Sequence, residues 1–339
     1  MRAPSQARLR VAALTALGLL HLSSWSADAD LIPAAQRSAA AKATANNAST
    51  CVAAQPFYWE IGDGKTALVS GQVGRKAPDA KTAMPIASAS KWIYGAYVAE
   101  RRQGRLTDSD VLFLNFRSGF TGFRTCLRGQ TVGDCATSFI NHRGERDDDA
   151  VGLFSYGGGH MQTHATRQMG LGELNNEGLA RAIQTGLSPL GSTWSITYTQ
   201  PQLAGGITST AADYAMFLRG LIRQDLQMGQ LLGTHAVCTN PSTCPKQALK
   251  TPLPADEQWQ YSLGHWVESD PKVGDGAFSS PGAFGFYPWI DASRRYYGIV
   301  ARTSHDGALS DDLSKKPYFV SIACGRDIRA AWLSGEARN

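Results

Sequence analysis

The sequence contains a serine and a lysine at a spacing that suits nucleophilic catalysis. Ser88 and Lys91 are three residues apart at the start of a segment with helical periodicity. In a helix such residues share one face, so the amine can hold or accept the serine proton if burial lowers its pKa. The helix N-terminus also favours negative charge developing at the serine. The pair predicts a serine nucleophile with a lysine base; the alternative is a helix-capping Ser88 and a solvated Lys91.

A second Ser-x-x-Lys occurs later in the chain, at Ser269 and Lys272. Pro271 lies between them and disrupts helical spacing. We therefore assign no catalytic role to this pair.

Two further segments carry residues that could complete such a site. Tyr156 is followed by three glycines, which suits a phenol presented from a tight turn, although a core tyrosine is the alternative. Ser280, Pro281, Gly282 and Ala283 precede an apolar strand. Because Pro281 has no N–H, we expect an edge strand or the start of a strand there. An open strand edge can receive a substrate backbone or an oxyanion.

Strands are predicted at both ends of the chain and helices in its middle. Predicted strands are a hairpin over 57–69, then 261–267, 284–290 and 296–302, and predicted helices are 88–104, 160–185, 210–225 and 317–333. This order predicts an α+β fold class, with an antiparallel sheet built from both chain ends and flanked by helices. We expect one domain over 51–339, with a helical insertion over about 105–255.

The N-terminal segment has the order of a secretory signal peptide, which we place at 1–29. Three arginines precede an apolar run over 11–22, and Ala27 and Ala29 follow as small cleavage-site residues. The run is too short to span a membrane, and no other stretch is apolar enough. We expect an Ala-rich flexible leader over 30–50 and a secreted or periplasmic protein without a membrane span after cleavage.

The exported chain contains an even number of cysteines, which predicts disulfides in an oxidising compartment. The six are Cys51, Cys126, Cys135, Cys238, Cys244 and Cys324. The close pairs Cys126–Cys135 and Cys238–Cys244 can each clip a loop. That pairing would leave Cys51 and Cys324 to tie the two chain ends together.

Composition excludes several classes of protein and partner. The 339 residues are 43% hydrophobic and 18% charged, enough apolar mass to exclude a disordered chain. The net charge is +5 and no block of five basic residues occurs, so we expect no nucleic-acid partner. His160 and His164 have zinc-like spacing, but no third ligand follows, so we expect no metal and no cofactor.

Taken together, the motifs resemble those of the serine β-lactamase-like hydrolases of the class C type. That family includes class C β-lactamases, D-alanyl-D-alanine carboxypeptidases, esterases and amide hydrolases. Segments in family order are 84–91, 104–110, 115–120, 154–156, 203–214 and 280–282. The run Leu-Ala-Gly-Gly-Ile-Thr-Ser-Thr-Ala-Ala-Asp-Tyr at 203–214, for example, resembles Ala-Gly-Gly-Leu-x-Ser-Thr-Ala-x-Asp-Leu of that family.

The resemblance implies a β-lactamase/transpeptidase-like fold and a role for each motif. Ser88 would attack the carbonyl, and Lys91 and Tyr156 would carry its proton. The N–H groups of Ser88 and Ala283 would form the oxyanion hole. Ser280, Gly282 and Gly158 would line the substrate site.

The chain departs from the family at two positions that recognise β-lactams and peptides. Gly158 replaces the Asn of Tyr-x-Asn, and Ser280 replaces the Lys or His of the third motif, for which His305 is a rival candidate. We therefore expect an exported hydrolase of a small or oligomeric ester or amide, with apolar walls from Trp92, Phe154 and Phe284. The alternatives are a β-lactamase, a D-alanyl-D-alanine carboxypeptidase, or a non-catalytic binder of penicillin or cell-wall ligands.

Overall fold

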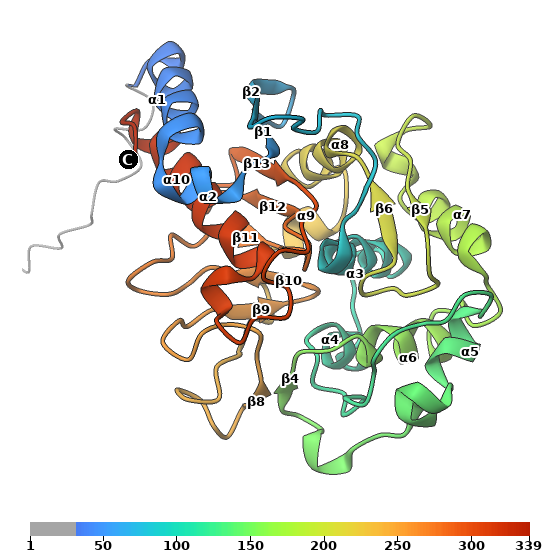
Figure 1. Ribbon diagram of the computed structural model, residues 1–339. Coiled ribbons are helices and arrows are strands. Elements are labelled where there is room, and N and C mark those ends of the chain that lie inside the picture. Colours follow the sequence, from blue (N-terminus) through green and yellow to red (C-terminus); the bar gives the residue numbers. More distant parts are fainter. Residues whose placement is uncertain (1–31) are drawn as a thin grey trace, which may run out of the picture.

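The computed structural model describes residues 32–339, and the predicted signal peptide over 1–29 lies outside the described residues. Its centre is an eight-stranded sheet in the order β2-β1-β13-β12-β11-β10-β9-β7 (Figure 1). All seven strand pairs in this sheet are antiparallel. The strands are β1 (Phe57–Asp63), β2 (Ala67–Val73), β7 (Val237–Cys238), β9 (Gln260–Ser262), β10 (His265–Val267), β11 (Phe278–Ser279), β12 (Tyr287–Ile290) and β13 (Tyr296–Ala301).

The sheet joins the two ends of the chain, as the sequence predicts. Strand β1 pairs with β13, so that Tyr58 lies opposite Ala301 and Asp63 opposite Tyr296. Helices cover the sheet and a helical region is inserted between its strands (Figure 1). The predicted α+β class is therefore confirmed.

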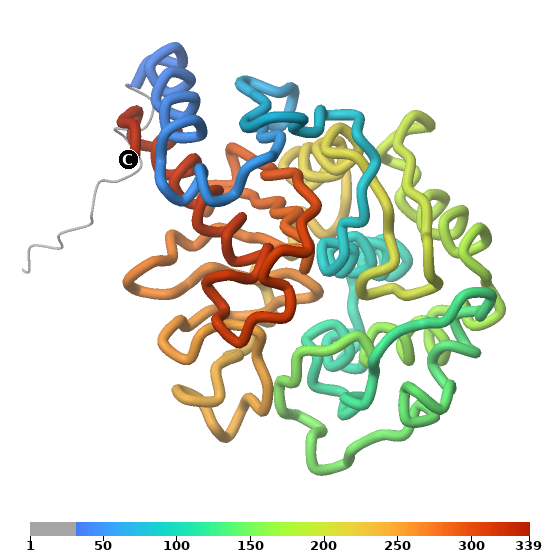
Figure 2. Tube along the Cα trace, viewed as in Figure 1, coloured from blue at the N-terminus to red at the C-terminus, as the bar shows by residue number. Residues whose placement is uncertain are grey.

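The first two helices lie beside the last one (Figure 2). These helices are α1 (Ala34–Asn47), α2 (Ser49–Ala54) and α10 (Pro317–Ser334). The guanidinium of Arg37 donates a 2.9 Å hydrogen bond to the Trp332 carbonyl. The prediction of a flexible leader over 30–50 was wrong. Alanine has the highest helix propensity, and its small side chain lets α1 pack closely on α10.

A second group of helices contains the segments of the predicted site. It comprises α3 (Ser90–Arg101), α4 (Asp108–Leu114), α5 (Val132–Ala136), α6 (Gly159–Arg167), α7 (Asn176–Gly186), α8 (Ala211–Ile222) and α9 (Met228–Leu231). The single helix predicted over 160–185 is two helices, α6 and α7. Gly170 adopts a φ of +67° between them, and the Asn175 side chain caps α7. Thr210 caps α8 through the Asp213 N–H, as predicted.

Two small sheets connect these helices to the main sheet. One contains β3 (Met84–Pro85), β6 (Ile207–Ser209) and β5 (Thr197–Tyr198), and the other pairs β4 (Phe154–Ser155) with β8 (Ala248–Lys250).

Two predicted strands have different bounds in the structure. The segment 261–267 is the hairpin β9–β10, because Leu263 and Gly264 both have positive φ and reverse the chain. The segment 284–290 becomes a strand only at Tyr287, because the preceding residues form a turn.

The disulfide pairing follows the sequence prediction. Cys126–Cys135 and Cys238–Cys244 close short loops, and Cys51–Cys324 joins α2 to α10. Among residues 32–339, no helix is long and apolar enough to cross a membrane.

Candidate active site

Ser88 and Lys91 are directly bonded at the start of α3. Ser88 lies in a 3₁₀ turn over Ala87–Ala89 that leads into the helix. The Lys91 amine donates to the Ser88 hydroxyl at 2.8 Å and to the Ala204 carbonyl at 2.6 Å. Lys91 is only 5% exposed, so the alternative of a solvated lysine was wrong.

Burial changes the proton affinity of this amine. Desolvation disfavours the ammonium form and lowers the pKa of Lys91 to about 7. At neutral pH a substantial fraction of the amine is therefore unprotonated. An unprotonated amine 2.8 Å from a serine hydroxyl can act as its general base.

The backbone around Ser88 is fixed from several directions. The Ile86 N–H donates to the Ile207 carbonyl at 3.0 Å, which extends the β3–β6 pairing. The Tyr214 hydroxyl of α8 donates to the Ala89 carbonyl at 2.9 Å. Ala87 adopts a φ of +44°, an uncommon conformation for a residue with a side chain. Such strain persists only where the surrounding structure holds it, as it does here.

Tyr156 lies beside the serine and lysine. It is half-buried immediately after β4, with its ring stacked on Trp266 at a centroid distance of 5.4 Å. The Lys91 amine is 5.0 Å from the centroid of the same ring. Burial raises the pKa of Tyr156 to about 12, although hydrogen bonding with Ser88 acts in the opposite direction. The phenol is therefore protonated at neutral pH and can serve as a proton donor.

A buried histidine fixes the backbone before Tyr156. One ring nitrogen of His160 lies 2.7 Å from the Ser118 hydroxyl, and the other 2.9 Å from the Ser155 carbonyl. Burial lowers the pKa of His160 to about 4. The ring is therefore neutral at neutral pH.

His164 has a different set of partners, although it is one helical turn from His160. Its ring nitrogens lie 2.8 Å from the Tyr94 hydroxyl and 2.9 Å from the Asp110 carboxylate. Within the described part of the chain, no group of three or more His, Cys, Asp or Glu side chains could hold a metal ion.

The segment 280–283 contacts the nucleophile segment directly. The Ser280 hydroxyl donates to the Ser88 carbonyl at 3.1 Å. Gly282 approaches Ile86 so closely that a Cβ atom there would lie 2.2 Å from the Ile86 carbonyl oxygen. Only glycine fits this contact, so the two segments pack backbone against backbone at Gly282 and Ile86.

The backbone N–H groups of this segment differ in their partners. The N–H groups of Ser280 and Gly282 donate to Pro288 and Phe286 on the β12 side. Ala283 lies in the turn that precedes β12, and its N–H group is the next donor along the chain. It makes no hydrogen bond to another residue within 32–339.

The edge-strand prediction for this segment was partly wrong. Strand β11 itself is interior, between β10 and β12. Pairing with β10 ends at Trp266 and Ser279, however, so the open edge begins after the strand.

The remaining predicted residues lie around this centre. Gly158 is the residue before α6, two positions after Tyr156. His305 is exposed, and its ring lies 4.9 Å from that of Phe284. Of the two candidates for the third motif, Ser280 is thus the one bonded to Ser88. Trp92 and Phe154 are fully buried in the core, so the prediction that they line the site was wrong.

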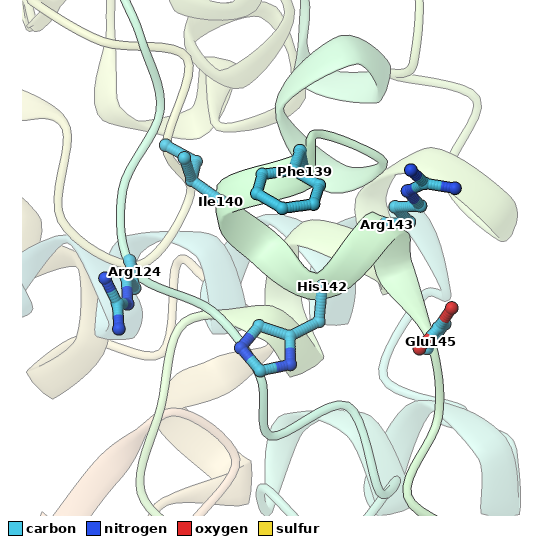
Figure 3. Close-up of a pocket in the computed structure, with 6 residues that line it drawn as sticks. All are labelled: Arg124, Phe139, Ile140, His142, Arg143 and Glu145. Carbon is cyan, nitrogen blue, oxygen red and sulfur yellow. The ribbon is translucent and has the colours of Figure 1, made fainter.

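A separate cavity lies on the turn Phe139–Gly144 (Figure 3). Its volume is about 370 Å³, and its lining residues are Arg124, Phe139, Ile140, His142, Arg143 and Glu145. None of the predicted site residues lines it. It is adjacent to the segment that carries Gly122, because a Cβ at Gly122 would contact the His142 ring.

Comparison with solved structures identifies the fold. No protein-family model matches the chain, and no curated protein matches it significantly. A β-lactamase-type protein from Bacteroides dorei DSM 17855 is 20% identical with a TM-score of 0.58, over 82% of this chain and 93% of that chain. A D-amino acid amidase from Ochrobactrum anthropi SV3 is 12% identical with a TM-score of 0.57, over 82% and 96%.

The chain has the β-lactamase fold. EstCE1, a hydrolase with promiscuous acyltransferase activity, shares this fold at 11% identity, with a TM-score of 0.56 over 86% of this chain and 98% of that chain. The β-lactamase-like fold implied by the motif resemblance is thereby confirmed.

Several residues around Ser88, Lys91 and Tyr156 were not predicted from the sequence. The Ala204 carbonyl that binds Lys91 lies in the matched run 203–214, but a backbone oxygen has no sequence signature. Trp266 and His160 position Tyr156 from separate elements. For His160, the one signal in the sequence was its position four residues after Tyr156.

Proposed function

We propose that this protein is a serine hydrolase that cleaves a carboxylic ester or amide through an acyl-enzyme on Ser88. The observation that carries the proposal is the hydrogen bond between Ser88 and a buried Lys91. Burying an amine without a carboxylate partner is costly, and such groups cluster at functional sites. The other β-lactamase-fold proteins include a hydrolase and an amidase, which supports this reaction class.

In the acylation step, the Ser88 oxygen attacks the substrate carbonyl carbon as Lys91 takes its proton. The backbone N–H groups of Ser88 and Ala283 stabilise the oxyanion of the tetrahedral intermediate. The intermediate collapses, and the bond to the leaving alcohol or amine breaks. Tyr156 protonates that leaving group and recovers a proton from Lys91.

In the deacylation step, water takes the place of the leaving group. Lys91, with Tyr156, accepts a proton from the water as its oxygen attacks the acyl carbon. The second tetrahedral intermediate expels the Ser88 oxygen, which regains a proton. The products are the free acid and the original enzyme.

The polar groups of the site favour esters over β-lactams. A β-lactam needs its carboxylate and its side-chain amide held while the ring opens. Ser280 carries no charge, and Gly158 offers no side-chain hydrogen bond. One lost hydrogen bond to a charged group reduces the rate by about one to two powers of ten.

We also propose that the protein works outside the cytoplasm, secreted or in a periplasm. Its three disulfides support this, because such bonds form and persist in oxidising compartments.

The test is the ratio of kcat/KM for a nitrophenyl butyrate to that for a chromogenic cephalosporin, measured on one preparation. We expect a ratio of at least about ten. A ratio below one would favour a β-lactamase, and turnover of a D-Ala-D-Ala peptide would favour a carboxypeptidase. Rapid acylation by the cephalosporin without turnover of any substrate would instead favour a non-catalytic binder.

A further inference from the structure

Gly158 is not required by the backbone conformation at its position. Its φ of −83° and ψ of −20° lie in the right-handed region that every L-residue adopts. A Cβ atom there would nevertheless lie 2.7 and 2.8 Å from two ring carbons of Phe123. The Phe123 ring therefore occupies the space that a side chain at 158 would need.

The segment that carries Phe123 is tied down on its C-terminal side. The Asn141 side chain is buried and accepts hydrogen bonds from the N–H groups of Arg124 and Thr125. It also donates to the Thr125 and Cys135 carbonyls, at 2.9 and 2.8 Å. The Cys126–Cys135 disulfide closes the loop that follows this segment. The ring is thus held in place over Gly158.

A short chain of contacts connects this ring with the base of the site. The same Cβ at Gly158 would also lie 3.5 Å from the Cβ of Ala204. The Ala204 carbonyl accepts the 2.6 Å hydrogen bond from Lys91. A side chain at position 158 would therefore reach both Phe123 and the residue whose carbonyl binds the Lys91 amine.

We propose that Phe123 determines acyl-group specificity. This inference rests on the proposed hydrolase function and names its substrate class: esters of short, unsubstituted carboxylic acids. The ring fills the space beside Gly158 with an apolar wall, which contacts a short alkyl chain but offers no hydrogen bond to a side-chain amide. Because the ring is fixed, a long acyl chain collides with it.

The test is the chain-length profile of kcat/KM for nitrophenyl acetate, butyrate and octanoate. Wild type should favour the short esters. Phe123→Ala should raise the octanoate-to-acetate ratio by about tenfold or more, and Phe123→Leu by less, since methylene-sized changes in apolar pockets have effects of this order. Phe139→Ala is the matched control: Phe139 is 79% exposed in the neighbouring cavity, and its loss should leave the ratio unchanged.

A double-variant cycle tests the contact itself. Gly158→Ala should lower kcat/KM in the wild-type background, because its new methyl meets the Phe123 ring. In the Phe123→Ala background the same change should have little effect. Additive effects of the two changes would overturn the contact as the reason for glycine.

Failure of this inference and failure of the proposed function give different results. An unchanged chain-length ratio in folded, active Phe123→Ala and Phe123→Leu proteins would overturn the role of Phe123 alone. Absence of hydrolysis of every ester, together with absence of fluorophosphonate labelling at Ser88, would overturn the hydrolase and this inference with it. Thermal unfolding of each variant establishes that it is folded, and Phe123→Leu decides the question if Phe123→Ala does not fold.

Discussion

As a base, Lys91 requires both burial from water and hydrogen-bond partners for its amine. Its hydrogen bonds to Ser88 and Ala204 supply the partners. Burial supplies the lowered pKa. The burial that makes the amine reactive also opposes folding, because the unfolded chain can protonate the amine freely.

The pH dependence of activity follows from this amine. Acylation requires the unprotonated form, and the pKa of Lys91 is about 7. We expect kcat/KM for nitrophenyl butyrate to be low in acid, to rise through about pH 7 and to level off above it. Lys91→Arg should be inactive across the range, since a guanidinium does not lose its proton. A flat profile between pH 5 and 9 would contradict a lysine base.

The residues of this centre differ in how far sequence could predict them. Ser88 and Lys91 share a helix face, so their spacing alone predicts their contact. Phe123 and Gly158 are 35 residues apart in the sequence, and no local pattern encodes their contact. Tyr156 was predictable as a phenol presented from a turn, but its stacking on Trp266 was not, because Trp266 is distant in the sequence.

At the scale of elements, α10 is attached to the sheet by a buried ion-pair network. Arg329 is fully buried and contacts the carboxylates of Glu268 at 2.9 Å and Asp275 at 2.6 Å. Its guanidinium also donates to the Tyr287 hydroxyl of β12 at 2.9 Å. Removing Arg329 leaves the buried Glu268 with Arg326 as its one remaining cation in this network and leaves Asp275 without its arginine.

We expect Arg329→Met to lower the free energy of unfolding by roughly 3–5 kcal/mol. The matched control is Arg181→Met, because the Arg181–Glu177 pair is exposed at 71% and 83% and contributes little. Urea denaturation of the two variants and wild type measures both effects. Equal midpoints for the two variants would show that the buried network does not hold α10.

Helix prediction succeeded where local signals were strong. Thr210 caps α8, and Pro317 opens α10, both as the sequence indicates. It failed at α6 and α7, where apolar residues continue across Gly170 and the break depends on one positive φ. The predicted start of β12 was also too early, because the turn before this strand is apolar as well.

At the scale of the whole molecule, the two chain ends close the structure together. Strands β1 and β13 are neighbours, and α2 is joined to α10 by Cys51–Cys324 across 273 residues of sequence. The pairing was predictable because four of the six cysteines formed close pairs. The packing of α1 was not, because alanines give no amphipathic pattern from which a buried face could be inferred.

Replacing Cys51 and Cys324 by alanine should lower the free energy of unfolding by roughly 2–5 kcal/mol. The same replacement at Cys238 and Cys244, six residues apart, should have a smaller effect, because a short loop loses less entropy when closed. Thermal or denaturant unfolding compares the two double variants. A larger loss from the short loop would contradict this account of how the chain ends are held.

The central claim is that Ser88 is the nucleophile, and covalent labelling measures it most directly. The protein is incubated with a fluorophosphonate and the modified peptide is located by mass spectrometry. We predict one adduct, on Ser88, together with loss of labelling and of ester hydrolysis in a folded Ser88→Ala protein. Ser269→Ala, from the Ser-x-x-Lys that contains Pro271, should label and react like wild type. An adduct on another residue, or retained labelling of Ser88→Ala, would contradict the account.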